Sequence, residues 1–357
     1  MPPIVAIQPD DYTDPRSPDR CDASSPRWAA ALKEAGYDIR WVDVYRSDIL
    51  QQLDGCCGLM WRWAHFGGMY RIARRLLPIA ERTLGLCVYP DQATCWHYDD
   101  KIAQTYLLTA LGIPFPQTWV FHDANEASDW ARTAKYPVVA KLAGGAGSTN
   151  VQLIHSREEV DALVRDLFAR WHVQLPGARR HLLEDSKRRL AETLRMSIRG
   201  RILLDHFETE PQKMSILFQE FLPGNEFDTR ITVIGRRAFG FRRMNRTGDF
   251  RASGSGQIDV SQSEIDPAFL RAAFQAADKL GTQSCAFDGL WKGDCPVFGE
   301  ISYTYASWAV ASCPGHWKLV GSPDHGEIRW VEGSMWPEDA QAADFIQRLR
   351  DRGHETT

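Results

Sequence analysis

Residues 218–235 read FQEFLPGNEFDTRITVIG. An apolar run there ends at a Pro-Gly turn, and a predicted strand follows in which Asp228, Arg230 and Thr232 alternate with mostly apolar residues. Side chains two residues apart on a strand share one face, so these three polar groups should lie together. An acid and an arginine on one face suit a charged ligand. Taken by itself, however, the segment is more typical of an antiparallel edge strand whose polar side faces water.

The composition is that of a globular chain with a sizeable core. The 357 residues are 44% hydrophobic and 25% charged, which suits two or three domains. The net charge of -4 provides no positive field for nucleic acid, so we expect no nucleic-acid partner. No basic region followed by a long apolar stretch opens the chain, and no window approaches the ~20 apolar residues of a membrane span. We therefore expect a cytoplasmic protein without a membrane partner.

The cysteines and tryptophans give weaker signals. The 8 cysteines contain no C-x-x-C pair and no spacing to histidine that suits zinc, so we expect them to be reduced and mostly buried. The 13 tryptophans are many for this length. Some could line a pocket, although core packing is the commoner explanation for aromatic residues.

Residues 1–95 have the pattern of a small open α/β domain. Strands are predicted at 4–7, 39–44, 58–63 and 86–89, with helices at 25–35 and around Ile72, Leu76 and Ile79. Strand, helix and strand in that order imply parallel pairing. The domain has no G-x-G-x-x-G, so dinucleotide binding is not indicated. Its loops, which include residues 61–63, lie where such sheets bind ligands but are equally compatible with ordinary connections.

Two lysines follow, each beside a feature that suits an anion. Lys101 lies in the first turn of a helix that Asp99 and Asp100 can cap. A cation gains nothing from the helix dipole there, so the position is mildly costly unless an anion approaches it, although a surface lysine is the commoner alternative. Lys141 ends a short β-branched strand at residues 136–141.

A glycine-rich loop follows the second lysine, where residues 144–149 read GGAGST. Glycine lets backbone N–H groups approach a polyphosphate closely, and the hydroxyl groups add donors. The loop is therefore a candidate phosphate cradle. It is not a Walker A loop, because no G-K-[S/T] follows at the required spacing. By itself, a flexible hairpin turn is the commoner explanation.

Residues 156–212 are predicted to be helical and strongly charged. One apolar stripe includes Val160, Leu163 and Leu167, and arginines crowd the later part. The segment could serve as a lid, as an oligomer contact such as a homodimer would use, or as a solvated face. For most of these arginines we favour the solvated face.

A hairpin is predicted directly after the opening stretch. The chain turns at residues 235–236 and returns through residues 238–244, which carry Arg242 and Arg243. Arginines on facing strands repel one another, and a fold tolerates them best when an anion lies between them. Transferring phosphoryl groups are such anions.

A second hairpin is predicted at residues 286–302. Symmetric pairing about its glycine turn places Asp288 opposite Phe298 and on the same face as Glu300 and Ser302. Two carboxylates and a hydroxyl then converge, and hard oxygen ligands suit Mg²⁺ better than zinc. A solvent-facing hairpin is the alternative. The neighbouring residues are apolar and aromatic, however, so unpaired acids there would be costly.

The order of these features resembles the ATP-grasp superfamily of carboxylate-amine ligases, most closely the branch of ribosomal-protein glutamate ligases and glutathione synthetases. The likeness covers about residues 97–305, and the ordered set is more specific than any single motif. It implies an α/β fold of the ATP-grasp type. An amino-terminal open parallel-sheet domain would span residues 1–95. Two α+β subdomains, residues 96–212 with a helical insertion and residues 213–357, would clasp ATP.

The resemblance also implies the site residues. Those assigned to ATP are Lys101, Lys141, Gly144, Gly145, Gly147, Ser148, Gln219, Glu220, Phe221, Leu222, Glu226 and Asp228. Those assigned to the γ-phosphate and an acyl phosphate are Arg230, Arg243 and Arg251, and those assigned to Mg²⁺ or Mn²⁺ are Asp288, Glu300 and Ser302. The family usually has asparagine where this chain has Ser302, and again near Ser253.

The implied activity is that of an ATP-dependent ligase. It would phosphorylate a carboxylate and let an amine displace the phosphate, giving an amide or peptide bond, ADP and phosphate. The cofactors would be ATP and Mg²⁺ or Mn²⁺, and the substrates a small-molecule carboxylate and amine. Two alternatives stay open, namely a small-molecule kinase of the same fold and a nucleotide-binding protein that has lost catalysis.

Overall fold

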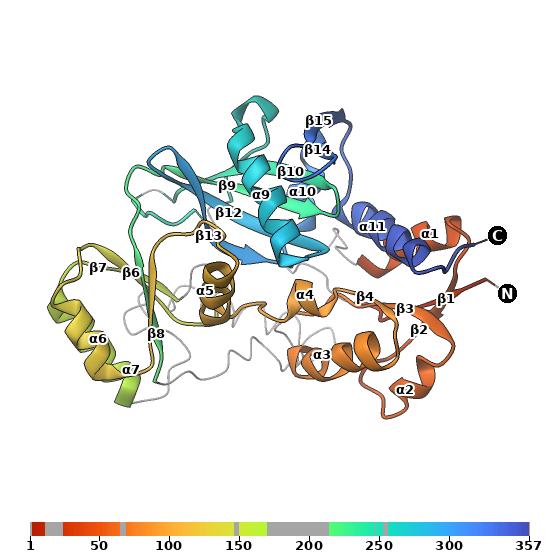
Figure 1. Ribbon diagram of the computed structural model, residues 1–357, viewed down its shortest axis with the longest axis horizontal. Coiled ribbons are helices and arrows are strands. Elements are labelled where there is room, and N and C mark those ends of the chain that lie inside the picture. The colour runs from red at the N-terminus through yellow and green to blue at the C-terminus, as the bar shows by residue number, and fades with distance from the viewer. Residues whose placement is uncertain are drawn as a thin grey trace, which may run out of the picture.

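The computed structural model describes residues 2–10, 24–64, 69–145, 150–169, 214–246, 248–252 and 256–356. These residues form three sheets with helices around them. In Figure 1 the parallel sheet lies to the right, a small antiparallel sheet to the left and a large antiparallel sheet above both. The predicted combination of an open parallel sheet with two α+β parts is confirmed.

The amino-terminal sheet is parallel, with the strand order β2-β1-β3-β4. Its strands are β1 (Ile4–Ile7), β2 (Asp38–Trp41), β3 (Cys56–Met60) and β4 (Cys87–Tyr89). Its helices are α1 (Ser24–Glu34), α2 (Ile49–Gln52) and α3 (Met69–Pro78), which a π-helix continues over Ile79–Thr83. The parallel pairing confirms the prediction from strand order. β1 has the predicted bounds, whereas β2, β3 and β4 are one or two residues shorter than predicted.

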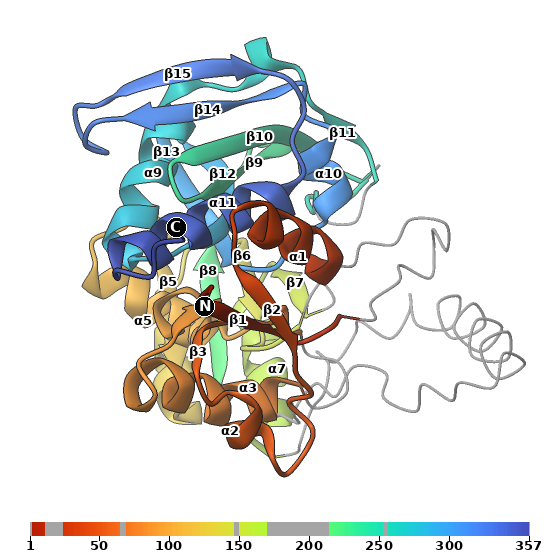
Figure 2. The same ribbon diagram turned by 90° about the vertical axis from the view of Figure 1, so that its right-hand side faces the viewer.

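The last helix of the chain, α11 (Pro337–Asp351), lies beside α1 against this first sheet (Figure 2). Its buried side chains share one core with the sheet and with α1, and that core includes Val5, Ile7, Trp28, Ala342, Phe345, Ile346 and Leu349. Apolar side chains on one stripe of α11 therefore complete a hydrophobic layer that residues 1–95 begin but do not fill.

The small sheet is antiparallel, with the strand order β5-β8-β6-β7. Its strands are β5 (Thr118–Phe121), β6 (Val138–Lys141), β7 (Val151–Ile154) and β8 (Ile216–Glu220), and α6 (Ala124–Ala131) and α7 (Arg157–Ala169) cover it. Two helices, α4 (Gln92–Cys95) and α5 (Lys101–Ala110), lead into it from the parallel sheet. Of the helical prediction for residues 156–212, α7 confirms the part at residues 157–169, and residues 170–213 lie outside the described residues.

The large sheet has the order β13-β12-β9-β10-β14-β15, with β11 beside β10. Its strands are β9 (Phe227–Ile234), β10 (Arg237–Met244), β11 (Ile258–Asp259), β12 (Ser284–Lys292), β13 (Cys295–Ser302), β14 (Gly315–Val320) and β15 (Glu327–Glu332). A 3₁₀ helix (Gln262–Glu264), α9 (Pro267–Leu280) and α10 (Ser307–Ala311) accompany them. Within the described residues, no helix is both long and apolar enough to cross a membrane.

The opening stretch does not form an edge strand. β9 lies between β10 and β12, and Ile231 and Val233 on one face pack into the core that α9 covers. The polar face is buried as well, since Asp228 and Thr232 are 8% and 0% exposed. The expectation of a solvated edge is therefore wrong, because the strands on both sides bring their own charged side chains to this face.

We expect Phe345→Ala to destabilise the protein by about 3–5 kcal/mol, because Phe345 is buried in the core that α11 shares with the parallel sheet and truncation leaves a cavity. Val320→Ala, at an exposed position of β14, should change stability by about 0.5 kcal/mol or less. Chemical denaturation of both variants measures the difference. Equal losses would contradict the packing of α11.

Candidate active site

A network of opposite charges occupies the polar face of β9. Arg230 pairs with Asp288 of β12, through Nε to Oδ1 at 2.6 Å and Nη2 to Oδ2 at 2.8 Å. Arg243 of β10 pairs with Asp228, through Nε to Oδ1 at 2.7 Å and Nη2 to Oδ2 at 2.5 Å. The same Nη2 also donates to Asp288 Oδ2 at 2.7 Å. Asp288 thus joins the two arginines.

These pairs explain how the fold tolerates arginines on facing strands. The sequence predicted an anion between them, and two carboxylates of the protein itself fill that place. Burial opposes the ionisation of Asp288, but the charges of Arg230 and Arg243 outweigh it and hold the pKa of Asp288 well below its usual range. Neither arginine uses Nη1 in a hydrogen bond to a described residue, so each guanidinium keeps donors for a ligand.

The register of the second hairpin differs from the prediction. Asp288 pairs with Glu300, not with Phe298, because a bulge at Gly299 adds one residue to β13. The two carboxylates therefore stand directly across from each other on neighbouring strands. Ser302 does not join them, since its hydroxyl donates to the carbonyl oxygen of Thr304 at 2.8 Å.

Lys101 connects three parts of the chain that are distant in sequence. It is the first residue of α5, which the side chain of Asp100 caps. Its Nζ donates to the carbonyl oxygen of Gly145 at 2.9 Å and lies 3.7 Å from Glu300 Oε1. Lys101 is only 7% exposed, so the surface alternative is wrong. A carboxylate and a carbonyl group offset the unfavourable helix dipole at this position.

The start of the glycine-rich loop is tightly held. The backbone N–H of Gly145 donates to both carboxylate oxygens of Asp99, at 3.1 and 3.2 Å, and Asn150 Nδ2 donates to the carbonyl oxygen of Gly144 at 2.8 Å. Gly145 has φ +125°, and a Cβ there would lie 2.6 Å from Asn150 Nδ2, so glycine is required. Gly147 and Ser148 lie outside the described residues.

Lys141 ends β6 and points toward the same region. Its Nζ donates to Gln219 Oε1 at 2.7 Å and to the carbonyl oxygen of Gly299 at 3.5 Å. Burial lowers the pKa of Lys141 to about 8, an effect that the nearby Glu300 only partly offsets. The bulge at Gly299 thus turns a backbone carbonyl toward this lysine.

Residues 221–226 link β8 of the small sheet to β9 of the large sheet, so they form a hinge segment between the two. Glu220 Oε1 accepts from the backbone N–H of Gln117 at 2.7 Å and also pairs with Lys292. The ring of Phe221 packs edge-on against Phe250. Further polar contacts are made by the carbonyl oxygens of Leu222, to Asn225, and of Glu226, to Asn245.

Arg251 lies apart from the other two arginines. Asp249 holds its guanidinium, with Nε 2.9 Å from both carboxylate oxygens. Nη1 donates to the carbonyl oxygen of Val151 at 3.5 Å, which sets Arg251 against β7, directly after the glycine-rich loop. The structure therefore brings Lys101, Lys141, Glu300 and the charge network together, with Arg251 on the loop side.

The residues that hold these groups in place were not all foreseen. Asp99 was considered only as a helix cap, yet with φ +55° it binds the loop through Gly145. Asn150 and the Gly299 bulge were not singled out. The sequence offers a signal for two of these three features. Asp99 stands next to the capping Asp100, and Gly299 is a single glycine within a strand.

The donors near Glu300 fit a divalent cation that also binds phosphate. Within the described residues, no group of three or more His, Cys, Asp or Glu side chains gathers into a metal centre. Asp288 and Glu300 nevertheless offer two facing carboxylates, and the Glu300 side chain is 42% exposed. Mg²⁺ is commonly held by one or two carboxylates with phosphate oxygens and water supplying the rest.

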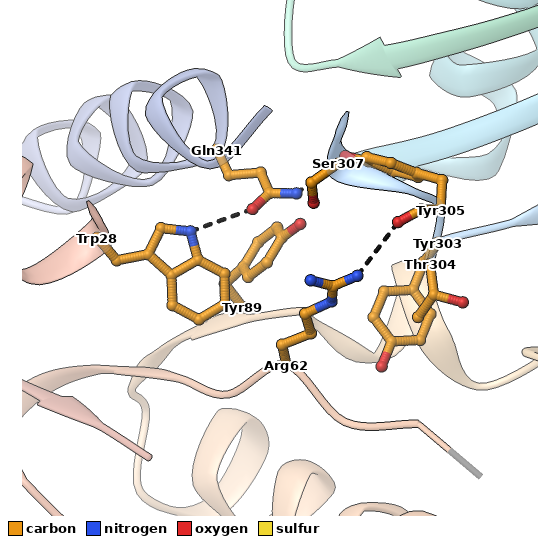
Figure 3. A pocket seen from close by; sticks show the side chains of 8 residues that line it. All are labelled: Trp28, Arg62, Tyr89, Tyr303, Thr304, Tyr305, Ser307 and Gln341. Carbon is orange, nitrogen blue, oxygen red and sulfur yellow. Dashed lines mark hydrogen bonds between the residues drawn. The ribbon is translucent and has the colours of Figure 1, made fainter. Parts of the chain in front are cut away.

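A small pocket lies between the carboxyl ends of β3 and β4 and the segment after β13 (Figure 3). Its lining residues are Trp28, Arg62, Tyr89, Tyr303, Thr304, Tyr305, Ser307 and Gln341. Arg62 donates to Ser24 Oγ at 3.2 Å and to the carbonyl oxygen of Tyr305 at 3.1 Å. One of the loops that the sequence left undecided thus reaches the carboxy-terminal part of the chain.

Arg242 and Arg243 are neighbours on β10 with opposite surroundings, which allows a matched comparison. Arg243→Met leaves Asp228 and Asp288 buried with less positive charge, and should cost about 3–5 kcal/mol of stability. Arg242→Met removes a contact with the more exposed Glu264 and should cost about 1 kcal/mol or less. Urea unfolding of both variants provides the test. A cost for Arg243→Met no larger than that for Arg242→Met would show that the network is not energetically coupled.

Comparison with known proteins identifies the fold. No protein-family model and no curated protein matches the sequence. Among solved structures, D-alanine–D-alanine ligase from Bacillus anthracis is similar at TM-score 0.55 and 11% identity over 99% of this chain and 98% of that one. A RimK domain protein ATP-grasp from Sphaerobacter thermophilus gives TM-score 0.50 and 16% identity over 96% and 99%.

A third solved structure is the RiPP-associated ATP-grasp ligase of Chryseobacterium gregarium, in complex with ADP and a leader and core peptide. It is similar at TM-score 0.54 and 14% identity, over 97% of both chains. All three cover nearly the whole of this chain. At these identities the likeness concerns the fold, and the predicted fold is confirmed: this chain has the ATP-grasp fold.

Proposed function

We propose that this protein is an ATP-dependent ligase that joins a carboxylate to an amine through an acyl phosphate and releases ADP and phosphate. The observation that carries the proposal is the position of Lys101, between Gly145 of the glycine-rich loop and the Glu300 carboxylate. A buried cation between a loop rich in backbone donors and an acid with hard oxygen atoms is suited to a metal–polyphosphate ligand.

In this proposal the phosphates of ATP lie over Lys101 and Lys141, and the loop that contains Gly144, Gly145, Gly147 and Ser148 covers them. Adenine and ribose occupy the hinge segment with Glu220, Phe221, Leu222 and Glu226. Gln219 acts through Lys141, which it holds by a 2.7 Å hydrogen bond. A hinge that joins the two sheets places the base where both can contact it.

Asp288 and Glu300 would hold Mg²⁺ or Mn²⁺, while Ser302, whose hydroxyl is engaged by Thr304, contributes less. The ion, when bound, offsets charge on the transferring phosphoryl group. The Nη1 groups of Arg230 and Arg243 supply further positive charge from the protein, and Arg251 adds it from the side of the loop. No protein nucleophile is required, since positioning and charge stabilisation perform the catalysis.

The chemistry proceeds in two displacements. A carboxylate oxygen of the substrate attacks the γ-phosphorus, and the bond to the β-phosphate oxygen breaks to release ADP. The amine nitrogen then attacks the acyl carbon, loses a proton and expels phosphate. The arginines stabilise negative charge on the phosphoryl oxygens in both steps. We place the substrates, a carboxylate and an amine, toward the pocket at Arg62, which opens beside the residues that follow Glu300.

The decisive experiment is a screen of amino acids and other small carboxylic acids for ADP release, with hydroxylamine present to trap an acyl phosphate as the hydroxamate. We expect an amine substrate to accelerate turnover. Glu300→Gln should lower kcat on the order of 10²-fold or more because it removes a metal-binding charge, whereas Glu327→Gln, in an exposed pair with Arg329, should not. A stable phosphorylated product without any amine would replace the ligase by a kinase, and absence of turnover with intact ATP binding would favour the inactive binding protein.

ATP binding should also take up a proton at alkaline pH. Lys141 has a pKa of about 8 without ligand, and nearby phosphates favour its charged form, so the pKa rises on binding. At pH 8.5 the free protein has largely lost this proton, and the complex regains it. At pH 6.5 both forms carry it and no uptake by Lys141 occurs. Calorimetry in two buffers of different ionisation enthalpy measures the uptake, which Lys141→Met should abolish and Lys279→Met should not. Equal heats in both buffers at pH 8.5 would contradict the assignment.

A further inference from the structure

Asp228 was expected to contact the nucleotide, but its surroundings indicate a different role. Both of its carboxylate oxygens accept hydrogen bonds from Arg243, at 2.7 and 2.5 Å, and the residue is 8% exposed. Both of these donors belong to one arginine, which forms a bidentate pair with Asp228. Any influence of Asp228 on the site must therefore pass through Arg243.

Arg243 is shared between two acids. Its Nη2 donates to Asp228 at 2.5 Å and to Asp288 at 2.7 Å, whereas its Nε donates only to Asp228. Arg243 thus binds Asp228 through two nitrogens and Asp288 through one. Since Asp288 already receives both Nε and Nη2 of Arg230, it is the more crowded of the two acids.

A metal ion and the arginines compete for Asp288. A carboxylate has about four lone-pair sites, and three donors from two arginines already occupy Asp288. A cation that binds there must displace or share one of these contacts. The contact of Arg243 is the one that can be given up, because Arg243 has a second carboxylate to hold it. Without the charge of Asp228, Arg243 would turn fully to Asp288 and neutralise it.

We propose that Asp228 is a positioning residue: it limits Arg243 to a single-nitrogen contact with Asp288 and so keeps Asp288 available to a divalent cation, without touching cation or nucleotide itself. The proposal rests on the proposed function in one respect, since it takes Asp288 as a cation ligand. It assigns the metal affinity of the site partly to a residue on a strand that carries no metal ligand.

The test compares Asp228→Asn, which keeps the shape and removes the charge, with Asp228→Glu, which keeps the charge. Glu264→Gln is the matched control, because Glu264 is the carboxylate partner of Arg242, the preceding residue on β10. Binding of Mn²⁺ is measured by electron paramagnetic resonance with a non-hydrolysable ATP analogue, and ADP release is measured over a range of Mg²⁺ concentrations.

Asp228→Asn should weaken Mn²⁺ binding at least tenfold, and excess Mg²⁺ should restore most of kcat while the KM for ATP at saturating Mg²⁺ changes less than about threefold. Asp228→Glu should recover part of the affinity, and Glu264→Gln should match the wild type. Unchanged Mn²⁺ affinity in Asp228→Asn, or a loss of kcat that Mg²⁺ does not restore, would overturn the proposal.

A crystal structure of ligand-free Asp228→Asn tests the positioning step without reference to ATP chemistry. We expect Arg243 to bind Asp288 through two nitrogens. An unmoved Arg243 would overturn the proposal even if the ligase activity is confirmed. Conversely, if the wild-type protein binds no Mn²⁺ in the presence of the nucleotide analogue, the metal site of the proposed function is contradicted. The role of Asp228 in metal affinity is then contradicted as well. If Asp228→Asn does not fold, Asp228→Glu serves in the same measurements, and an Arg243 that moves toward Asp288 there without any loss of Mn²⁺ affinity would overturn the proposal.

Discussion

The mutual neutralisation of two arginines and two aspartates on one sheet face is the constraint on which this site depends. Arg230, Asp288, Arg243 and Asp228 are all largely removed from water, and each charge alone would be strongly unfavourable there. They are tolerated because β9, β10 and β12 place them within hydrogen-bond distance. The register of these three strands therefore determines the geometry of the site. If one strand shifted by one residue, its charged side chains would turn to the opposite face of the sheet.

The alternation of polar and apolar residues allowed part of this arrangement to be predicted from the sequence. The alternation in residues 228–232 correctly predicted a shared polar face, and the hairpins on either side were predicted from their glycine turns. The fold itself followed from the order of the features along the chain. The burial of β9 could not be predicted in the same way. Its neighbours in the sheet come from residues 237–244 and 284–292, and the sequence of one strand does not show which strands pair with it.

The errors have local physical causes. The pairing of Asp288 depended on a bulge at Gly299 that adds one residue, and a symmetric hairpin cannot anticipate it. The anion expected between the arginines is supplied by two carboxylates of the protein, Asp228 and Asp288. The order of charged residues in the sequence does not show that they meet there. Lys101 was correctly seen as unfavourable at a helix start, but its partners, Gly145 and Glu300, are 44 and 199 residues away in sequence, and only the fold brings them near.

The position of α11 has a consequence for how the chain is made. The strands of the parallel sheet are synthesised before the two antiparallel sheets, yet a layer of their hydrophobic core is supplied by Phe345, Ile346 and Leu349, which follow those sheets in the sequence. During synthesis that surface of β1 and β3 stays uncovered until α11 is made, by which time both antiparallel sheets already have all their strands. Of the three sheets, the parallel one is thus synthesised first and completed last, and termination of translation before residue 337 leaves it with an exposed apolar face.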